Sequence, residues 1–358
     1  MAFRMPASRS RARRRATPLA AVLLLPLLAA ARCGGSELDP PRGDLRVLVV
    51  SDLNSSYGST TYEPTVAHAA RLAREVWKPD LVLAAGDLIA GQRPTLSDAN
   101  VRAMWTAFDS VVRRPLRAAG IPFGFALGNH DASAAPAHRR DRALAAAFWR
   151  DAAHATGLAF VDSAGYPLNY SFRQGDAFFL VWDASHAGTA RDTALVRWVG
   201  EALASDVARQ AKLRFVVGHL PLYAVAEGRN RAGEVLDEPD SLRALLERHA
   251  VHTYVSGHHH AYYPGRRGRL ELLHAGALGQ GARPLLGQAQ PSPQTVTLLD
   301  VFFARDSVAY TTFAYQPGGA PALRRLEPGE LPPRLRGLTG YVVRRDLPDT
   351  VAPAPVRP

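Results

Sequence analysis

The chain has 358 residues, 47% of them hydrophobic, which is enough for one large domain or two modest ones. Its formal net charge is +11, but residues 1–35 hold seven arginines and no acid, which leaves +4 for the rest. That remainder shows no basic stripe interleaved with aromatic residues, so nothing indicates nucleic-acid binding. The single cysteine excludes a fold held together by internal disulfides.

Residues 1–35 are predicted to be a signal peptide. An arginine-rich start with a twin-arginine pair precedes the apolar stretch 18–31, which is short for a membrane span and typical of an export signal. Cys33 has the position of a lipidated lipoprotein cysteine, although Arg32 stands where that pattern has a small residue. We expect an exported protein, either periplasmic or anchored to the membrane through Cys33, with 36–44 as a linker. An uncleaved N-terminal anchor is the alternative.

From residue 45 the chain alternates buried strands with amphipathic helices. Pro64 and Ser97 suit helix starts, and Gly120 suits a helix end. We expect strands at 45–52, 79–87 and 121–131 and helices at 64–77, 97–120 and 139–155. Strands that alternate with helices in this way predict an α/β sheet with helices on its faces.

The second half adds hairpins to this alternation. Gln174-Gly175-Asp176 is a predicted hairpin turn. The expected elements are a hairpin at 170–185, helices at 192–209 and 240–249, strands at 213–219, 251–258 and 270–277, and a hairpin at 295–315. Residues 317–358 hold nine of the 27 prolines, so we expect a loop or a loosely draped tail there.

Five of the predicted strands end in residues of the types that bind metal ions. These endings are Asp52-Leu53-Asn54, Gly86-Asp87, Gly128-Asn129-His130-Asp131, Gly218-His219 and Gly257-His258-His259-His260. Ligands of open α/β sheets bind outside the carboxyl ends of the strands. One polar ending is common, but five endings that carry Asp, Asn and His predict a metal site at this edge.

The three consecutive histidines follow an apolar run, so strand alternation predicts their directions. Residues two apart in an extended segment point the same way. His258 and His260 should therefore face the site and His259 the opposite side. A solvated run of histidines is the alternative, and the position of this run inside the domain disfavours it.

The motifs SDLN, AGDL, LGNHD, VVGH and SGHHH resemble, in this order, those of the calcineurin-like metallophosphoesterase superfamily. The likeness spans 45–260 directly, and LGNHD and SGHHH carry most of its specificity. It implies an α/β fold with a central β-sandwich of two mixed sheets, flanked by helices in four layers. The domain would cover 45–316, and the proline-rich tail at 317–358 would follow it.

The resemblance also implies a role for each motif residue. Two divalent ions would share the carboxylate of Asp87, and His130 would face the substrate as the catalytic acid without binding metal. Two ions about 3.5–4 Å apart lower the pKa of a bridging water, whose hydroxide attacks phosphorus. The first ion would be held by Asp52, Asn54, Asp87 and His260, and the second by Asp87, Asn129, His219 and His258.

The sequence departs from the family pattern at Asn54, where the family has a histidine. A neutral oxygen ligand favours Mn²⁺, with Fe, Zn and Mg as alternatives, or else leaves that place to water. Three substrate-binding candidates lie near the motifs. Tyr57 either enters the site or covers the cleft, Asp131 either orients His130 or caps its turn, and His259 adjoins two ligands.

Together these features predict an exported, metal-dependent phosphohydrolase acting on a small phosphorylated substrate. Phosphodiester or nucleotide-type substrates are favoured, because two phosphomonoesterase signatures are missing. Ala90 stands where one phosphatase branch has a tyrosine ligand, and GDLIAGQR lacks the Asp-Arg-Gly of protein Ser/Thr phosphatases. A broad phosphomonoesterase is the alternative. A surface lipoprotein that binds phosphorylated ligands without turnover is a rival of another class, favoured only by Asn54. Membrane contact is expected only through the signal peptide or a lipid anchor.

Overall fold

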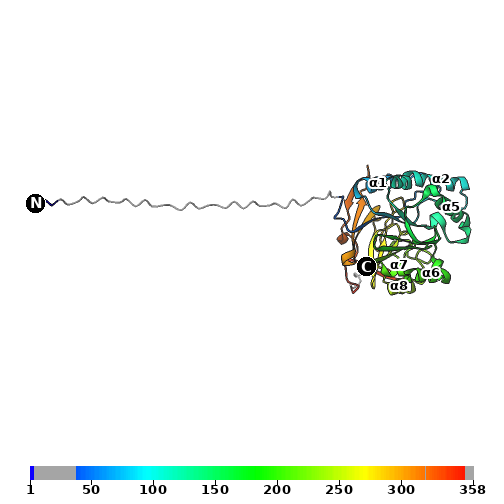
Figure 1. Ribbon diagram of the computed structural model, residues 1–358. Helices are drawn as coiled ribbons and strands as arrows, with labels where there is room; N and C mark the ends of the chain where they lie inside the picture. The colour runs from blue at the N-terminus through cyan, green and yellow to red at the C-terminus, as the bar shows by residue number, and fades with distance from the viewer. Residues whose placement is uncertain (4–37, 319, 351–358) are drawn as a thin grey trace. The chain divides into compact units, whose positions relative to one another are not determined.

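The computed structural model describes residues 1–3, 38–318 and 320–350 (Figure 1). The chain divides into two compact units, Met1–Gly34 and Gly35–Pro358, and the fold below is that of the second unit. Nearly all of the predicted signal peptide, including Cys33, lies outside the described residues. Within the described part of the chain, no helix is long and apolar enough to cross a membrane.

The first sheet has six strands in the order β13-β12-β11-β1-β2-β3. Strands β1, β2 and β3 are parallel, and β11 pairs antiparallel with β1 and extends the sheet through β12 and β13. The strands are β1 (Leu45–Val50), β2 (Leu81–Ala85), β3 (Phe123–Ala126), β11 (Thr295–Phe302), β12 (Ser307–Tyr315) and β13 (Leu323–Arg325).

The second sheet has nine strands in the order β14-β15-β9-β10-β8-β7-β6-β5-β4. Its centre, β10-β8-β7-β6, is parallel, and both flanks are antiparallel. The strands are β4 (Ala159–Gly165), β5 (Asn169–Gln174), β6 (Ala177–Val181), β7 (Leu213–Val217), β8 (Thr253–Ser256), β9 (Tyr263–Arg267), β10 (Leu270–His274), β14 (Arg334–Gly337) and β15 (Gly340–Arg344).

Helices cover the outer face of each sheet, with α1, α2 and α5 on one side and α6, α7 and α8 on the other (Figure 1). The α-helices are α1 (Pro64–Leu72), α2 (Asp98–Phe108), α3 (Arg114–Ala118), α4 (Asn129–Ala132), α5 (Arg139–Arg150), α6 (Thr193–Ala204), α7 (Asp206–Gln210) and α8 (Pro239–Arg248). Two π-helical segments continue α1 and α2, at Ala73–Trp77 and Asp109–Arg113. Short 3₁₀ turns lie at Pro136–His138, Ala152–His154, Ala187–Arg191, Phe303–Arg305 and Pro328–Glu330.

Alternation along the strands builds three apolar layers. Val47 and Val49 of β1 point into the core between the two sheets, whereas Leu48 and Val50 point toward the helices. In the second sheet Phe179 faces the central core. Because both sheets are covered on both faces, their central strands are buried throughout. The predicted α/β sandwich of two mixed sheets flanked by helices in four layers is confirmed.

The C-terminal segment differs from the prediction. We expected a loop or loosely draped tail, but β13, β14 and β15 extend both sheets. Arg345, just after β15, pairs with Glu271 at 2.9 Å and lies 3.9 Å from the ring centre of Tyr310. The prolines described in this segment lie between the strands or after β15, so they interrupt pairing without preventing it.

Candidate metal centre

The predicted strand ends lie together in the structure. Backbone hydrogen bonds join the turns that follow them: Asp52 N–H donates to the Gly86 carbonyl at 3.0 Å, and Gly257 N–H to the His219 carbonyl at 2.9 Å. The strands that carry the motifs end at Val50 (β1), Ala85 (β2), Ala126 (β3), Val217 (β7) and Ser256 (β8). The motif residues therefore occupy one edge of the sandwich, as expected from the parallel strands.

Two groups of side chains in this edge have the spacing of metal ligands. The His260 group consists of Asp52, Asp87 and His260, and the His258 group of Asp87, His219 and His258. Within each group the potential ligand atoms lie within 4.8 Å of one another. All five residues are buried, and Asp87 belongs to both groups. A shared carboxylate between two ligand groups is the arrangement that holds two adjacent ions.

Hydrogen bonds fix which nitrogen of each histidine faces the site. His219 Nδ1 lies 2.7 Å from the Ala85 carbonyl and His260 Nδ1 lies 3.1 Å from the Gly281 carbonyl. A carbonyl oxygen only accepts, so both Nδ1 atoms carry the proton and both Nε2 atoms keep a free electron pair. In His258 the hydrogen-bonded nitrogen is Nε2 rather than Nδ1. Such partners orient metal-binding imidazoles.

The unprotonated Nε2 atoms of His219 and His260 face oxygen atoms, which can likewise only accept a hydrogen bond. His219 Nε2 lies 3.2 Å from Asp87 Oδ2 and 3.0 Å from Asn129 Oδ1, and His260 Nε2 lies 3.2 Å from Asp52 Oδ1. Facing acceptors repel unless a proton or a cation lies between them. Burial opposes the imidazolium of His219, but Asp87 and Asp52 outweigh it and raise its pKa to about 9. These residues fit divalent ions, whose charge would replace that proton.

Asn54 also fits an ion. Its side chain is 5% exposed, and its Oδ1 is buried without any hydrogen-bond partner. An unsatisfied buried amide oxygen costs about 1–3 kcal/mol, which coordination of a cation would offset. The residue lies two positions after Asp52, on the same turn. Its structure therefore agrees with the ligand role predicted for it.

Gln92 orients the Asn129 amide. Gln92 Oε1 accepts a hydrogen bond from Asn129 Nδ2 at 2.6 Å, so the Asn129 oxygen faces His219. The backbone of Gln92 has a φ of 68°, in a left-handed region that non-glycine residues seldom adopt. This contact could not be inferred from the sequence, because Gln92 follows Gly91 in a loop without any ligand pattern.

Glu234 was also missed by sequence reasoning, and it supports His258. Its Oε2 lies 2.9 Å from His258 Nε2, which leaves His258 Nδ1 buried and without a hydrogen-bond partner. Arg229 and Arg231 both pair with the same carboxylate. Burial would raise the pKa of Glu234, but His258 and the two arginines hold it well below its usual range. A carboxylate behind a histidine strengthens that histidine as a metal ligand.

Four ligand positions have left-handed backbone conformations. The φ angles are 50° at Asp52, 53° at Asp87, 64° at His258 and 52° at His260. Non-glycine residues in such conformations cost about 1–3 kcal/mol each and cluster at functional sites. The predicted strand alternation of the histidines is therefore wrong in its reason, because β8 ends at Ser256. His258 and His260 still reach the ligand groups, through turns.

Two glycines of the motifs allow this crowding. A Cβ on Gly128 would overlap Asp87 Oδ1, and a Cβ on Gly257 would overlap Ser51 Oγ and lie 2.6 Å from Asp52 Oδ2. Ser51 Oγ itself donates to Asp52 Oδ2 at 2.6 Å. The glycine before each ligand therefore leaves space for a carboxylate from a neighbouring strand end.

His130 lies beside the two groups without belonging to them. Its backbone N–H donates to Asp87 Oδ1 at 2.9 Å, and its Nε2 lies 3.9 Å from Asp87 Oδ2. Its imidazole stacks on Tyr57, with ring centres 5.0 Å apart. Tyr57 is 52% exposed, so its ring stands at the open side of the site.

Two other candidates for substrate contact have structural roles. Asp131 is fully buried and accepts three backbone hydrogen bonds, from Leu88, Ile89 and Gly128. His259 is fully buried, and its ring nitrogens lie 3.2 Å from the Val225 nitrogen and 2.9 Å from the Glu234 carbonyl oxygen. Both side chains are held by hydrogen bonds within the fold, and substrate contact by Asp131 and His259 stays a prediction.

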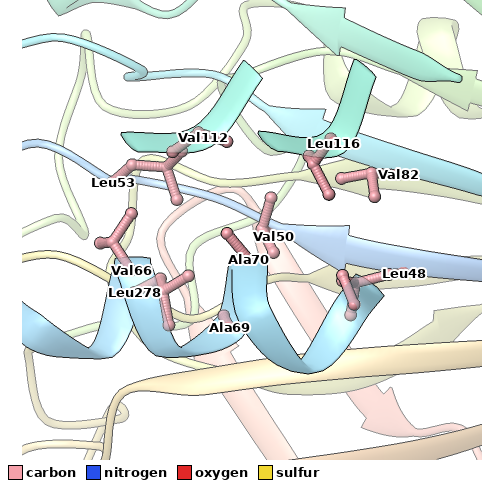
Figure 2. A pocket seen from close by; sticks show the side chains of 11 residues that line it. Leu48, Val50, Leu53, Val66, Ala69, Ala70, Val82, Val112, Leu116 and Leu278 are labelled. Carbon is pink, nitrogen blue, oxygen red and sulfur yellow. The ribbon is translucent and has the colours of Figure 1, made fainter. Parts of the chain in front are cut away.

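An apolar cavity lies behind the site, between β1 and α1 (Figure 2). All of its lining side chains are aliphatic, and Leu53 and Leu278 are among them. Leu53 lines this cavity, whereas its neighbours Asp52 and Asn54 lie at the edge of the sandwich that carries the ligand groups. A cavity lined by aliphatic side chains offers no side-chain partner for a phosphate, so it is not a substrate site.

Comparisons with known proteins agree with this geometry. The family model of calcineurin-like phosphoesterases matches residues 45–262, more than half of the chain. The chain belongs to the calcineurin-like phosphoesterase family. The predicted superfamily is thus confirmed, and with it the expectation of a phosphoesterase. A search of curated proteins gives no match.

Solved structures match this chain at low sequence identity. A purple acid phosphatase from yellow lupin (Lupinus luteus) seeds has a TM-score of 0.52 and 14% identity, over 75% of this chain and 53% of its own. GAP50, the anchor in the inner membrane complex of Plasmodium, has a TM-score of 0.48 and 12% identity, over 79% and 88%. A putative 5'-nucleotidase from Staphylococcus aureus has a TM-score of 0.41 and 12% identity, over 79% and 53%. This chain thus spans about half the length of the lupin enzyme.

Proposed function

We propose that this protein hydrolyses phosphate esters with the help of two divalent metal ions. The observation that carries the proposal is the shared Asp87, which belongs to two ligand groups whose histidines are held with free nitrogens toward the oxygens. Bound ions would supply an activated water and neutralise charge on the phosphoryl oxygens. Water then adds to phosphorus, and the ester oxygen leaves with a proton.

His130 is the residue that delivers this proton. Its Nδ1 is buried and without a hydrogen-bond partner, and its side chain is 14% exposed, so it reaches the site without binding in either ligand group. General acids of this kind contribute about 10²–10⁴-fold to rate. Tyr57 holds the imidazole by stacking and offers its exposed face to the leaving group.

Phosphodiester or nucleotide-type esters are the proposed substrates. Ala90, buried at 2% exposure three residues after Asp87, cannot act as the tyrosine ligand of one phosphatase branch. A broad phosphomonoesterase is the second candidate, supported by the sandwich shared with the lupin purple acid phosphatase. A binding protein without turnover is disfavoured, because Asp87 and His130 are both present.

Mn²⁺ is the proposed resident ion. Asn54 contributes a neutral amide oxygen where the family has an imidazole, and oxygen ligands suit Mn²⁺ and Mg²⁺ better than Zn²⁺. Fe, Zn and Mg are the other candidates. Elemental analysis of the purified protein would identify the ion, and Zn²⁺ at full occupancy would overturn the proposal.

Export is proposed from the sequence, with the mature protein beginning at or after Cys33. Mass spectrometry of membrane and soluble fractions would test it. A diacylglyceryl adduct on Cys33 would support the lipoprotein form, and a free N-terminus after the apolar stretch would support the periplasmic form. An unprocessed chain in the native host would contradict both.

A panel of chromogenic monoesters and diesters with added Mn²⁺ tests the activity. We expect the diesters to be hydrolysed faster than the monoesters, and the Asp87→Asn variant to hydrolyse neither. Faster monoester hydrolysis would establish the phosphomonoesterase. If the metal-loaded wild type binds phosphate and turns over none of the panel, the binding protein is correct.

A further inference from the structure

Two loops border the metal centre on the side of His258 and His260. Residues 226–234 hold His258 through Glu234, and residues 279–283 hold His260 through the Gly281 carbonyl. The loops are joined by the Ala226–Leu285 bridge and by a hydrogen bond of 2.9 Å from Glu227 N–H to the Pro284 carbonyl. They therefore form one wall beside both ligand groups.

This wall carries three arginines and too few acids to neutralise them. Arg229 and Arg231 share the carboxylate of Glu234. Arg283 forms no ion pair with any described carboxylate, and its buried Nε has no hydrogen-bond partner. Glu227, the other acid of these loops, accepts the Gly287 N–H at 2.7 Å and pairs with no arginine.

The arginines lie close to one another and to the ligands. Arg229 Nη1 is 3.5 Å from His258 Nε2, and a Cβ built on Gly228 would lie 3.3 Å from Arg283 Nη1. The backbone N–H of Arg283 donates to the His260 carbonyl at 3.2 Å. Positively charged guanidinium groups held close together beside a site for two metal ions attract an anion.

We propose that Arg283, with Arg229 and Arg231, binds a second anionic group of the substrate, so that diphosphate esters are preferred over esters with one phosphate. The inference rests on the hydrolysis proposed above. One phosphate would occupy the metal centre, and its neighbour would meet the guanidinium groups. Arginine is suited to this task because its planar fork donates two parallel hydrogen bonds to a phosphate.

A matched pair of substrates tests the proposal. AMP and ADP differ by one phosphate. Phosphate release with Mn²⁺ present follows both reactions: water breaks the ester bond of AMP and adenosine leaves, or it breaks the phosphoanhydride bond of ADP and AMP leaves. We expect Arg283→Gln to lower kcat/KM for ADP about tenfold, the value of one charge-assisted hydrogen bond, and for AMP less than twofold. Arg283→Lys should recover part of the loss. Arg197→Gln is the control, because Arg197 is 73% exposed on α6.

Binding of inorganic anions separates this inference from the proposed function. Calorimetric titration of the metal-loaded protein should show that Arg283→Gln weakens pyrophosphate about tenfold and leaves orthophosphate nearly unchanged. If wild type hydrolyses no ester but shows this difference, the hydrolysis fails and the anion subsite stands. Equal weakening of both anions, or no weakening of either in a variant with unchanged Tm, would overturn the subsite.

Discussion

The two ligand groups share Asp87 but differ in what supports them. In the His258 group, the carboxylate of Glu234 lies 2.9 Å from His258, and Gln92 fixes Asn129, whose oxygen faces the same group. In the His260 group, Nδ1 of His260 faces the backbone carbonyl of Gly281 at 3.1 Å, where His258 has a carboxylate.

This difference indicates which ion is held less firmly. A carboxylate behind a histidine raises its basicity, whereas a backbone carbonyl mainly orients it. The neighbouring Asn54 offers a neutral amide, which binds transition ions more weakly than imidazole. We therefore expect the ion of the His260 group to leave first and the ion of the His258 group to remain. Substitutions of single residues test this difference in metal affinity, beginning with Asp87, which both groups share.

Replacing Asp87, the ligand that both groups share, should remove the difference in metal affinity between them. Asp87→Asn removes the negative charge that both ions need, so we expect both to be lost. Activity should fall about a thousandfold or more, because metal assistance is worth several kcal/mol. Elemental analysis with kinetic assays measures both effects. Retention of one ion at full occupancy would show that Asp87 does not bridge the groups.

His130 should separate catalysis from metal binding. We expect His130→Gln to lower kcat about 10²-fold or more while both ions stay in place. The loss should be greater for esters with poor leaving groups, because these need the proton most. A series of aryl phosphates of graded leaving-group pKa would measure the slope. Loss of metal from this variant would move His130 into the ligand set.

Glu234 should affect one ion only. Glu234→Gln keeps the size of the side chain but removes the charge behind His258, so affinity at the His258 group should fall about 10–100-fold. The His260 group should be nearly unaffected. Glu201→Gln, on the exposed face of α6, is the matched control. Competition with a metal-sensitive dye would measure both affinities, and equal weakening of the two ions would contradict the assignment.

Asn54 should have the smallest effect, confined to the other ion. Asn54→Ala should weaken the ion of the His260 group about tenfold, the loss of one polar ligand, and leave the other in place. Asn54→His should tighten it and reduce the requirement for added Mn²⁺. If wild type keeps both ions through dialysis against a chelator and Asn54→Ala does the same, Asn54 is not a ligand and belongs to the substrate pocket.

The sequence predicted the strand ends better than the loops. Asp52, Asp87 and His219 follow parallel strands whose carboxyl ends must meet, so their convergence could be inferred without coordinates. The directions of His258 and His260 could not be inferred in this way, because both residues lie in left-handed turns beyond β8.

Glu234 and Gln92, which orient ligand residues, could not be predicted for a different reason. Glu234 precedes His258 by 24 residues and Gln92 precedes Asn129 by 37, so each contact depends on how two loops fold against each other. Neither loop has a periodic pattern that would indicate its path. The strands β13–β15 were missed because they are short and flanked by prolines, and partners far away in the chain determine their pairing.

Titration of the metal-free protein with Mn²⁺ in a calorimeter would measure the affinities of both ligand groups. We expect two ions per chain that bind in separate steps, the tighter at the His258 group. Asn54→Ala should then weaken only the second step. A single ion per chain, or two ions of equal affinity that both respond to Asn54→Ala, would contradict a binuclear centre with unequal halves.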